Sequence, residues 1–218
     1  AVEVDRERRR VGTVDPLRRV QGHLGQIRWS PQPGVRRPLV AVLDTGADGS
    51  SPDLRRAIQV NLARSFVDDA PLRDRSGHGT HVAGLIAATT NNGIGIAGVS
   101  NARLMIIKIA DAQGRATTST LVRGINAAVA GGAKVINISF GGAGFSQLEQ
   151  DAILEARRAG VLVVAAAGNS GRLGSPTEYP GAYRHVLTVG ATRADGQAIA
   201  ESTRGPQVAL AAPGKQIL

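Results

Sequence analysis

The sequence has 218 residues, of which 42% are hydrophobic but only 3% aromatic, so we expect a core of small aliphatic side chains in one large or two small domains. The absence of cysteine excludes disulfides and thiol chemistry, and without an 18-residue apolar run no membrane partner is expected. The net charge of +9 invites a nucleic-acid-binding interpretation, but the basic residues are scattered and cluster only at 6–10, so we expect a solvated surface and no specific nucleic-acid partner.

Residues 1–35 are rich in arginine, glycine and proline and show little periodicity. We predict an extended N-terminal segment that wraps over the surface, with a short helical turn near Leu17–Val20. Ala1 opens a charged stretch rather than an apolar one, so no signal peptide is expected in this chain. The remaining residues, 36–218, are predicted to form one domain.

Apolar runs and helical periods alternate through that domain. Strands are predicted at 39–43, 64–67, 103–110, 134–139, 161–166, 186–191 and 207–211. Helices are predicted at 53–59, from the stretch 76–84 to about 89, at 117–130 and at 146–159. Ser146 and Glu149 have the spacing of a capping box at the start of the last helix. This alternation predicts an α/β fold with a doubly wound, mostly parallel sheet flanked by helices.

Polar residues stand where three of these strands end, and a histidine stands at the start of a helix. The strand-end residues are Asp44, Ser139 and Asn169, and the histidine is His78. Taken singly, Asp44 is explained equally well as a turn-forming residue as it is as a functional one. His78 taken singly is explained as a structural histidine at a helix start. Together they match a known requirement: a general base, a carboxylate that fixes its tautomer, and a donor that meets a developing oxyanion.

The same stretches resemble the motifs of the subtilisin-like serine proteases. Val40–Gly46 resembles the aspartate motif of that family and Gly77–Gly84 its histidine motif. Val135–Gly142 resembles its substrate-binding strand. Ala166–Ser170 resembles the oxyanion-hole segment of the family, and Tyr179–Gly181 resembles the loop after it. Ala212–Gly214 resembles the turn before the final catalytic segment. The likeness runs from about residue 36 to the C-terminus and implies a subtilisin-like peptidase that cleaves peptide or protein substrates.

Carried over by motif, the resemblance implies that Asp44 orients His78, that His78 is the general base, and that Asn169 donates to the oxyanion. It also implies that an extended peptide pairs with the main chain of the binding segments and that one wall of the specificity pocket is glycine- and alanine-rich. The implied substrate-binding residues are Ser139, Phe140, Gly141, Gly114, Ala116, Ala166 and Gly168. His81 is expected to pack rather than to bind zinc, because its spacing from His78 is not that of the helical metal pair.

The resemblance further implies a structural calcium site, although the loop 91–96 is one residue longer than the family pattern. Its expected ligands are the side chains of Asp53 and Asn92 and the carbonyls of Ile94 and Ile96. No cofactor is expected for the chemistry itself.

The family's nucleophilic serine lies in a Gly-Thr-Ser-Met-Ala-like motif, and this sequence contains no such motif. We therefore expect the fold to be incomplete at its C-terminus, with 36–218 forming a peptidase domain that lacks its C-terminal part. The isolated chain is predicted to be inactive and to need a complementary C-terminal segment. A non-catalytic peptide-binding fragment or pseudoenzyme stays open as the alternative. The resemblance implies secretion.

Overall fold

The computed structural model describes residues 14–31 and 36–218, and seven strands of this part form one sheet in the order β2-β3-β1-β4-β5-β6-β7. Every neighbouring pair of strands is parallel. The strands are β1 Leu39–Asp44, β2 Arg64–Ser65, β3 Arg103–Lys108, β4 Val135–Ile138, β5 Leu162–Ala166, β6 Val186–Thr192 and β7 Val208–Pro213. The predicted doubly wound α/β fold is confirmed.

Strand β1 lies at the topological switch point of the sheet, where β3 and β2 lie on one side of it and β4 to β7 on the other. From β1 the chain goes to β2 at one edge of the sheet and returns to β3 beside β1, and it then crosses to β4 on the other side of β1 and continues outward to β7. All six residues of β1 are buried, which explains why its sequence is a continuous apolar run rather than an alternating one. In open parallel sheets, ligand sites form beyond the carboxyl ends of strands at such a switch point.

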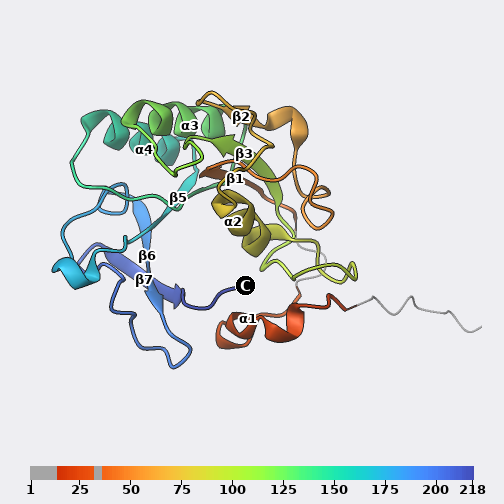
Figure 1. The fold of residues 1–218 in the computed structure, drawn as a ribbon. Coiled ribbons are helices and arrows are strands. Elements are labelled where there is room, and N and C mark those ends of the chain that lie inside the picture. The colour runs from red at the N-terminus through yellow and green to blue at the C-terminus, as the bar shows by residue number, and fades with distance from the viewer. Residues whose placement is uncertain (1–13, 32–35) are drawn as a thin grey trace, which may run out of the picture.

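Helices cover the two faces of the sheet unequally (Figure 1). Helices α3 Thr118–Ala130 and α4 Gln147–Arg158 pack together and cover one face, with Ile125 and Ile153 in the core beneath them. Helix α2 His78–Ala87 packs on the other face against β1 and β3. Among the described residues, no helix is long and apolar enough to cross a membrane.

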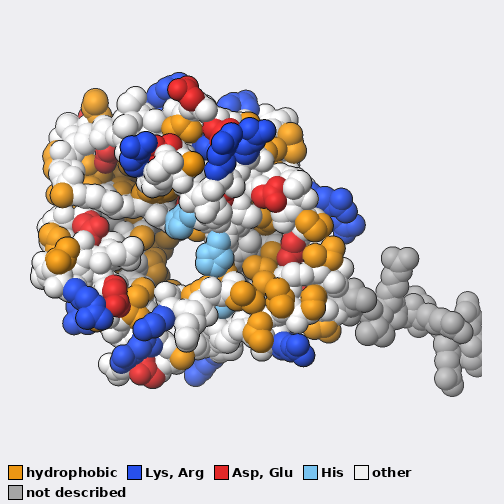
Figure 2. Space-filling model, viewed as in Figure 1, with side chains coloured by type: hydrophobic (Ala, Val, Ile, Leu, Met, Phe, Trp, Pro, Cys, Tyr) orange, Lys and Arg blue, Asp and Glu red, His pale blue; other side chains and the backbone are white. Residues whose placement is uncertain are grey.

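The second face of β5 and the outer strand β7 carry exposed apolar side chains. In β5, Val163 and Ala165 are buried, whereas Leu162 and Ala166 are exposed, so one face of the strand is open. Leu210 in β7 is 54% exposed. The space-filling view shows a hollow at the centre of this side of the molecule, with histidine side chains at its edge (Figure 2).

Two local predictions are wrong. Residues 53–59 form turns rather than a helix, since the chain there closes hydrogen bonds back to Ser51 and then joins the edge of β3 through Ile58. Ser146 makes no side-chain cap at α4, because Glu149 is drawn to the hydroxyls of Thr118 and Tyr183 instead. A capping box does form at α3, between Thr117 and Thr120.

The described part of the N-terminal segment, 14–31, lies along the loop 91–99. It contains a 3-10 turn, η1 Arg18–Val20, and a short helix, α1 Gly22–Gln26. The buried Asp15 carboxylate accepts the main-chain N–H groups of residues 91 and 92 at 2.8 and 2.9 Å. Further 3-10 turns are η2 Val60–Leu62 and η3 Gly171–Leu173. The basic cluster at 6–10 and most of the predicted extended arm lie outside the described residues.

Candidate active site

Neighbouring strands bring the predicted strand-end residues to one edge of the sheet. Asp44 is the last residue of β1, Ser139 follows β4, and Asn169 comes three residues after β5. Strands β1, β4 and β5 are consecutive in the sheet and parallel, so their carboxyl ends share this edge. The sequence prediction that these polar groups meet therefore follows from the topology.

Helix α2 begins at His78 and packs very closely on the end of β1. The next residue, Gly79, is buried, and a Cβ there would lie 2.1 Å from the carbonyl oxygen of Gly46 and 3.0 Å from the Asp44 side chain. Only glycine permits this approach. The close packing at Gly79 thus sets the first turn of α2 against Asp44.

His78 and Asp44 form a direct contact. Nδ1 of His78 lies 2.7 Å from Oδ1 of Asp44, and the Asp44 side chain is fully buried whereas that of His78 is 46% exposed. A carboxylate only accepts, so Nδ1 carries the hydrogen and Nε2 faces outward as the proton acceptor. The hydrogen bond to Asp44 raises the pKa of His78, against the opposing effect of burial, and the charges of Asp44 and Asp74 add to the increase.

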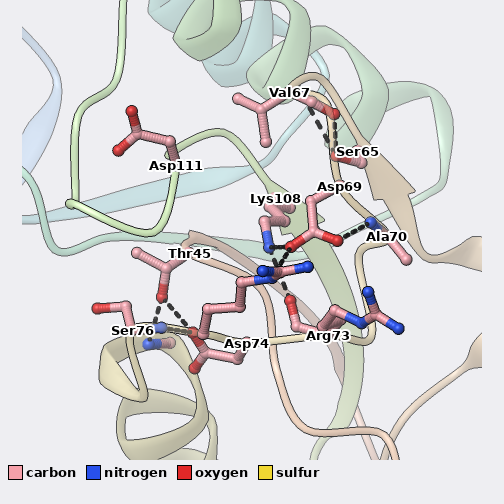
Figure 3. Close-up of polar contacts among 12 residues, drawn as sticks. Thr45, Ser65, Val67, Asp69, Ala70, Arg73, Asp74, Ser76, Lys108 and Asp111 are labelled. Atoms are coloured by element: carbon pink, nitrogen blue, oxygen red, sulfur yellow. Dashed lines mark hydrogen bonds and ion pairs between the residues drawn. The ribbon is translucent and has the colours of Figure 1, made fainter.

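Asp74 organises the turn that carries this pair (Figure 3). Its Oδ1 accepts the Thr45 hydroxyl at 2.9 Å and the main-chain N–H groups of Ser76 and Gly77, while Oδ2 accepts both the N–H and the hydroxyl of Thr80. These hydrogen bonds together hold the pKa of Asp74 below its usual value, although burial alone would raise it. Thr45 in turn accepts the Gly79 N–H at 3.0 Å and donates its own N–H to Asp44 at 2.8 Å. The carboxylate therefore ties the start of α2 to the end of β1.

A buried lysine also supports this strand end (Figure 3). Lys108 pairs with Asp44 in the strand register, is 1% exposed, and donates to Oδ2 of Asp69 at 3.0 Å and to the carbonyl of Arg73 at 2.7 Å. These contacts satisfy the buried ammonium group and fix the loop 69–73 over β1 and β3. Sequence reasoning did not select Lys108 or Asp74 as site residues, although a charged residue inside an apolar strand, as Lys108 is, is a usable signal.

Four of the implied substrate-binding residues lie around one pocket of about 360 Å³. They are Gly114 and Ala116 in the loop after β3, and Phe140 and Gly141 after β4. The Phe140 ring stands 6.0 Å from the His78 ring, centroid to centroid, which places this pocket beside the candidate base. Glu149 also lines the pocket, and nothing in the sequence singled it out as a site residue.

The implied wall residue Gly168 lies away from that pocket, against a second carboxylate. Gly168 has φ +106°, and a Cβ there would fall 2.3 Å from the Glu178 carboxyl group. A Cβ added at Gly141 would lie 3.1 Å from Oε2 of the same carboxyl group. Glu178 accepts the Thr203 hydroxyl at 2.6 Å. Ala166 and Asn169 are exposed nearby, and the Asn169 side chain makes no hydrogen bond to a described residue. Glu178 is another residue that sequence reasoning missed.

The residues expected to bind calcium lie together, but hydrogen bonds already join them. Asp53 accepts the side-chain amide of Asn92 at 2.8 Å and the N–H of Ile96 at 3.0 Å, while Asn92 accepts the N–H of Ile94 at 2.7 Å. A buried carboxylate, an amide and carbonyls suit Ca²⁺ in chemical type, provided that the Asn92 amide turns its oxygen toward the ion. Among the described residues, this loop included, no group of three or more His, Asp or Glu is placed to hold a metal.

Within 14–31 and 36–218, no hydroxyl group hydrogen-bonds Nε2 of His78. Ser139 instead accepts the side-chain amide of Asn137 at 3.0 Å. Ser202 is buried and bonds the N–H of Ala191 at 3.0 Å. The described site therefore contains the candidate base His78 and the carboxylate that accepts its Nδ1–H, and neither of these serines is positioned as the partner of His78.

Comparison with known proteins gives a consistent result. The sequence profile of the Subtilase family matches residues 36–217. The Thermostable alkaline protease of Halalkalibacterium halodurans is 42% identical over 180 residues, which cover 82% of this chain and 48% of that protein. Subtilisin amylosacchariticus of Bacillus subtilis subsp. amylosacchariticus is 40% identical over 183 residues, covering 82% of this chain and 47% of the relative. The Major intracellular serine protease of Bacillus subtilis is 41% identical over 200 residues, covering 87% and 62%.

The chain spans about half the length of the first two of these relatives, at 48% and 47%. The matched region nevertheless contains β1 to β7 and both members of the His78–Asp44 pair. With the family profile covering most of the chain and several relatives about 40% identical, the chain belongs to the subtilase family.

Proposed function

We propose that this chain forms the aspartate- and histidine-bearing part of a serine endopeptidase that hydrolyses peptide bonds through an Asp-His-Ser triad. The observation that supports this most is the 2.7 Å contact between Nδ1 of His78 and the fully buried Asp44 carboxylate. A buried carboxylate that fixes the tautomer of a half-exposed histidine is the arrangement a general base requires. The names of the relatives, which are proteases, support the same assignment.

In the proposed reaction, a serine hydroxyl oxygen attacks the carbonyl carbon of the scissile bond, and its proton passes to Nε2 of His78. Asp44 stabilises the imidazolium that forms. His78 then gives the proton to the leaving amine as the C–N bond breaks, which leaves an acyl-enzyme. Water then attacks the ester carbonyl carbon and loses a proton to His78. As the C–O bond to the serine breaks, His78 returns this proton to the serine oxygen, which releases the acid and restores the serine.

Asn169 is proposed to donate its side-chain amide to the oxyanion of each tetrahedral intermediate. The exposed side chain at the edge of the sheet is consistent with this role. In subtilisin, a member of the same family, loss of the corresponding donor lowers turnover about 10²- to 10³-fold. The main chain at 139–141 and at 114–116 is proposed to pair with the extended peptide, because these segments flank the pocket beside His78.

The serine is proposed to come from a further segment that covers the open face of β5 to β7. The exposed Leu162, Ala166 and Leu210 on these strands support this, because apolar side chains on a sheet face are stabilised by a covering layer. The 218-residue chain alone is then inactive. In subtilisin, loss of the serine alone lowers turnover about 10⁶-fold.

The test compares the 218-residue chain with a longer product of the same gene, using a fluorogenic peptide. The longer polypeptide should cleave it, the chain alone should not, and His78→Ala should abolish cleavage in the former. Cleavage by the chain alone that depends on His78 would contradict the assignment of the serine to another segment. A longer polypeptide that binds peptides but never cleaves them would favour the alternative, a non-catalytic peptide-binding protein or pseudoenzyme.

A structural calcium site at Asp53, Asn92, Ile94 and Ile96 is also proposed. Support comes from the contact of the Asp53 and Asn92 side chains at 2.8 Å. Bound Ca²⁺ would raise the melting temperature, because it binds the folded state only. Melting curves with 5 mM Ca²⁺ and with EGTA should differ for the native chain and coincide for Asp53→Asn. Equal curves for the native chain would exclude the site.

Secretion is proposed from the resemblance of the motifs alone. The relative from Bacillus subtilis that is named an intracellular serine protease supports the opposite compartment. Fractionation of the producing cells, with detection of this chain in medium and cell lysate, decides between them.

A further inference from the structure

Glu149 is a buried carboxylate in the wall of the pocket of about 360 Å³ beside Phe140. The residue is 8% exposed. Its Oε1 accepts the Thr118 hydroxyl at 2.6 Å and its Oε2 accepts the Tyr183 hydroxyl at 2.9 Å. Both contacts are to neutral hydroxyls, and no described Lys, Arg or His forms an ion pair with Glu149. The carboxylate therefore lies in the pocket without a cationic partner.

Other charges around the pocket do not neutralise Glu149. Arg115 also lines the pocket, but its guanidinium group pairs with Asp111 at 2.8 Å. Glu149 lies in the first turn of α4, where the positive end of the helix dipole stabilises a carboxylate in part. Burial raises the pKa of Tyr183 to about 12, and its hydrogen bond to the Glu149 carboxylate adds to the increase. Among the described residues that line the pocket, Glu149 is thus the one acidic side chain and Arg115 the one basic side chain.

The remaining lining is apolar or uncharged and suits an aliphatic stem. Leu121, Phe140, Tyr179 and Pro180 provide the hydrophobic surface of the pocket. A lysine or arginine side chain has such a stem with a cation at its tip. The pocket volume of about 360 Å³ is within the range of small-ligand sites. An ion pair made in a site shielded from water is stronger than one on an open surface.

We propose that this pocket receives a lysine or arginine side chain of the bound peptide, with Glu149 as the residue that determines specificity there. The inference rests on the proposed function, because the two segments that flank the pocket are those proposed to pair with the peptide. It adds a substrate class to that function: peptides with a basic residue at one defined position.

The experiment measures binding of fluorescent alanine-based hexapeptides to the 218-residue chain and, in parallel, cleavage by the longer polypeptide. Lysine, norleucine or glutamate replaces alanine at one position at a time. Norleucine retains the stem of lysine without its charge, so the lysine-to-norleucine ratio of affinities isolates the ion pair. At one position only, we expect lysine to bind at least about tenfold more tightly than norleucine, which corresponds to about 1.4 kcal/mol.

Glu149→Gln should reduce that ratio to near one. Glu155→Gln is the matched control, since Glu155 lies on the same helix with a side chain 62% exposed and outside the pocket. This control changes the net charge equally and should keep the ratio. A lysine-to-norleucine ratio near one at every position in the native chain, or a ratio that survives Glu149→Gln, would overturn the inference.

The native chain gives a second readout should Glu149→Gln fail to fold. Raising NaCl from 0.05 to 0.5 M should narrow the lysine-to-norleucine ratio at the one position and leave norleucine binding unchanged. A ratio insensitive to salt contradicts the ion pair. If no peptide is bound by the 218-residue chain or cleaved by the longer polypeptide, both the proposed function and the inference fail. If the norleucine and lysine peptides bind equally tightly, the proposed function stands and only the inference fails.

Discussion

The hydroxyl of Thr45 donates to Oδ1 of Asp74 at 2.9 Å, so its shorter hydrogen bond goes to the loop before α2 rather than to the Asp44 carboxylate beside it. Its distance to Oδ1 of Asp44 is longer, 3.3 Å. The contact joins the end of β1 to the loop that precedes α2. Asp74 is thus a positioning residue: it does not touch His78, yet it holds both elements on which the His78–Asp44 pair stands.

Asp74→Asn should destabilise the fold and lower the pKa of His78. The amide retains one acceptor oxygen for donors that two carboxylate oxygens now share, and it removes a negative charge that raises the His78 pKa. We expect a loss of about 1–3 kcal/mol in the free energy of unfolding. Urea unfolding measures the first effect and NMR titration of the His78 ring the second. Asp151→Asn, at an exposed position of α4, should change neither. An unaltered His78 pKa in Asp74→Asn would contradict the electrostatic link.

Asp44→Asn should lower the pKa of His78 further than Asp74→Asn does. The hydrogen bond from Nδ1 to Asp44 is the largest cause of the raised pKa, and an amide carries no charge to stabilise the imidazolium. In the longer polypeptide, turnover should fall about 10⁴-fold, the magnitude seen when this carboxylate is removed from serine proteases. NMR titration of the 218-residue chain gives the pKa without any need for activity. A His78 pKa equal to that of the native chain would show that the contact is absent in solution.

Proton linkage at His78 gives a pH dependence with a definite sign. The folded pKa of His78 is raised above its ordinary value of 6.5, so its protonated form stabilises the folded state. This contribution is fully present below pH 6.5 and is lost as the pH rises through the folded pKa. Urea unfolding across this window should show stability falling with pH in the native chain and a flatter profile in His78→Ala. The activity of the longer polypeptide should rise over the same window, because the base must be neutral.

Two glycines of α2 should respond oppositely to alanine. Gly79→Ala places a Cβ 2.1 Å from the Gly46 carbonyl oxygen, so we expect a loss of about 1–3 kcal/mol in the free energy of unfolding, together with displacement of His78. Gly84→Ala is the matched control: its Cβ would meet only Ile96 at 3.5 Å, an ordinary contact. There alanine should stabilise by up to about 1 kcal/mol through its helix propensity. Equal effects of the two substitutions in urea unfolding would contradict the close packing at Gly79.

Sequence reasoning identified the sheet, its parallel order and the Asp44–His78 pair because each has a local signal. Continuous apolar runs mark strands buried on both faces, and the glycines on both sides of His78 mark a helix start where the backbone can approach a ligand closely. The sequence-based prediction failed where a local sequence pattern competed with contacts to residues far away in the chain. Ser146 and Glu149 have capping-box spacing, but Thr118 and Tyr183 lie 31 and 34 residues away from Glu149 and take both of its oxygens.

The sequence alone therefore determined which strands form the sheet and which end of it carries the site, because hydrophobic periodicity and the order of the chain fix both. Only the tertiary structure decided how the charged residues are used. Asp74 and Lys108 are satisfied internally and support the pair, whereas Glu149 is left without a cation in a pocket. A carboxylate looks the same in a sequence whether it caps a helix, pairs with a lysine or awaits a ligand. Its burial and its partners, set by chain segments far apart, make the difference.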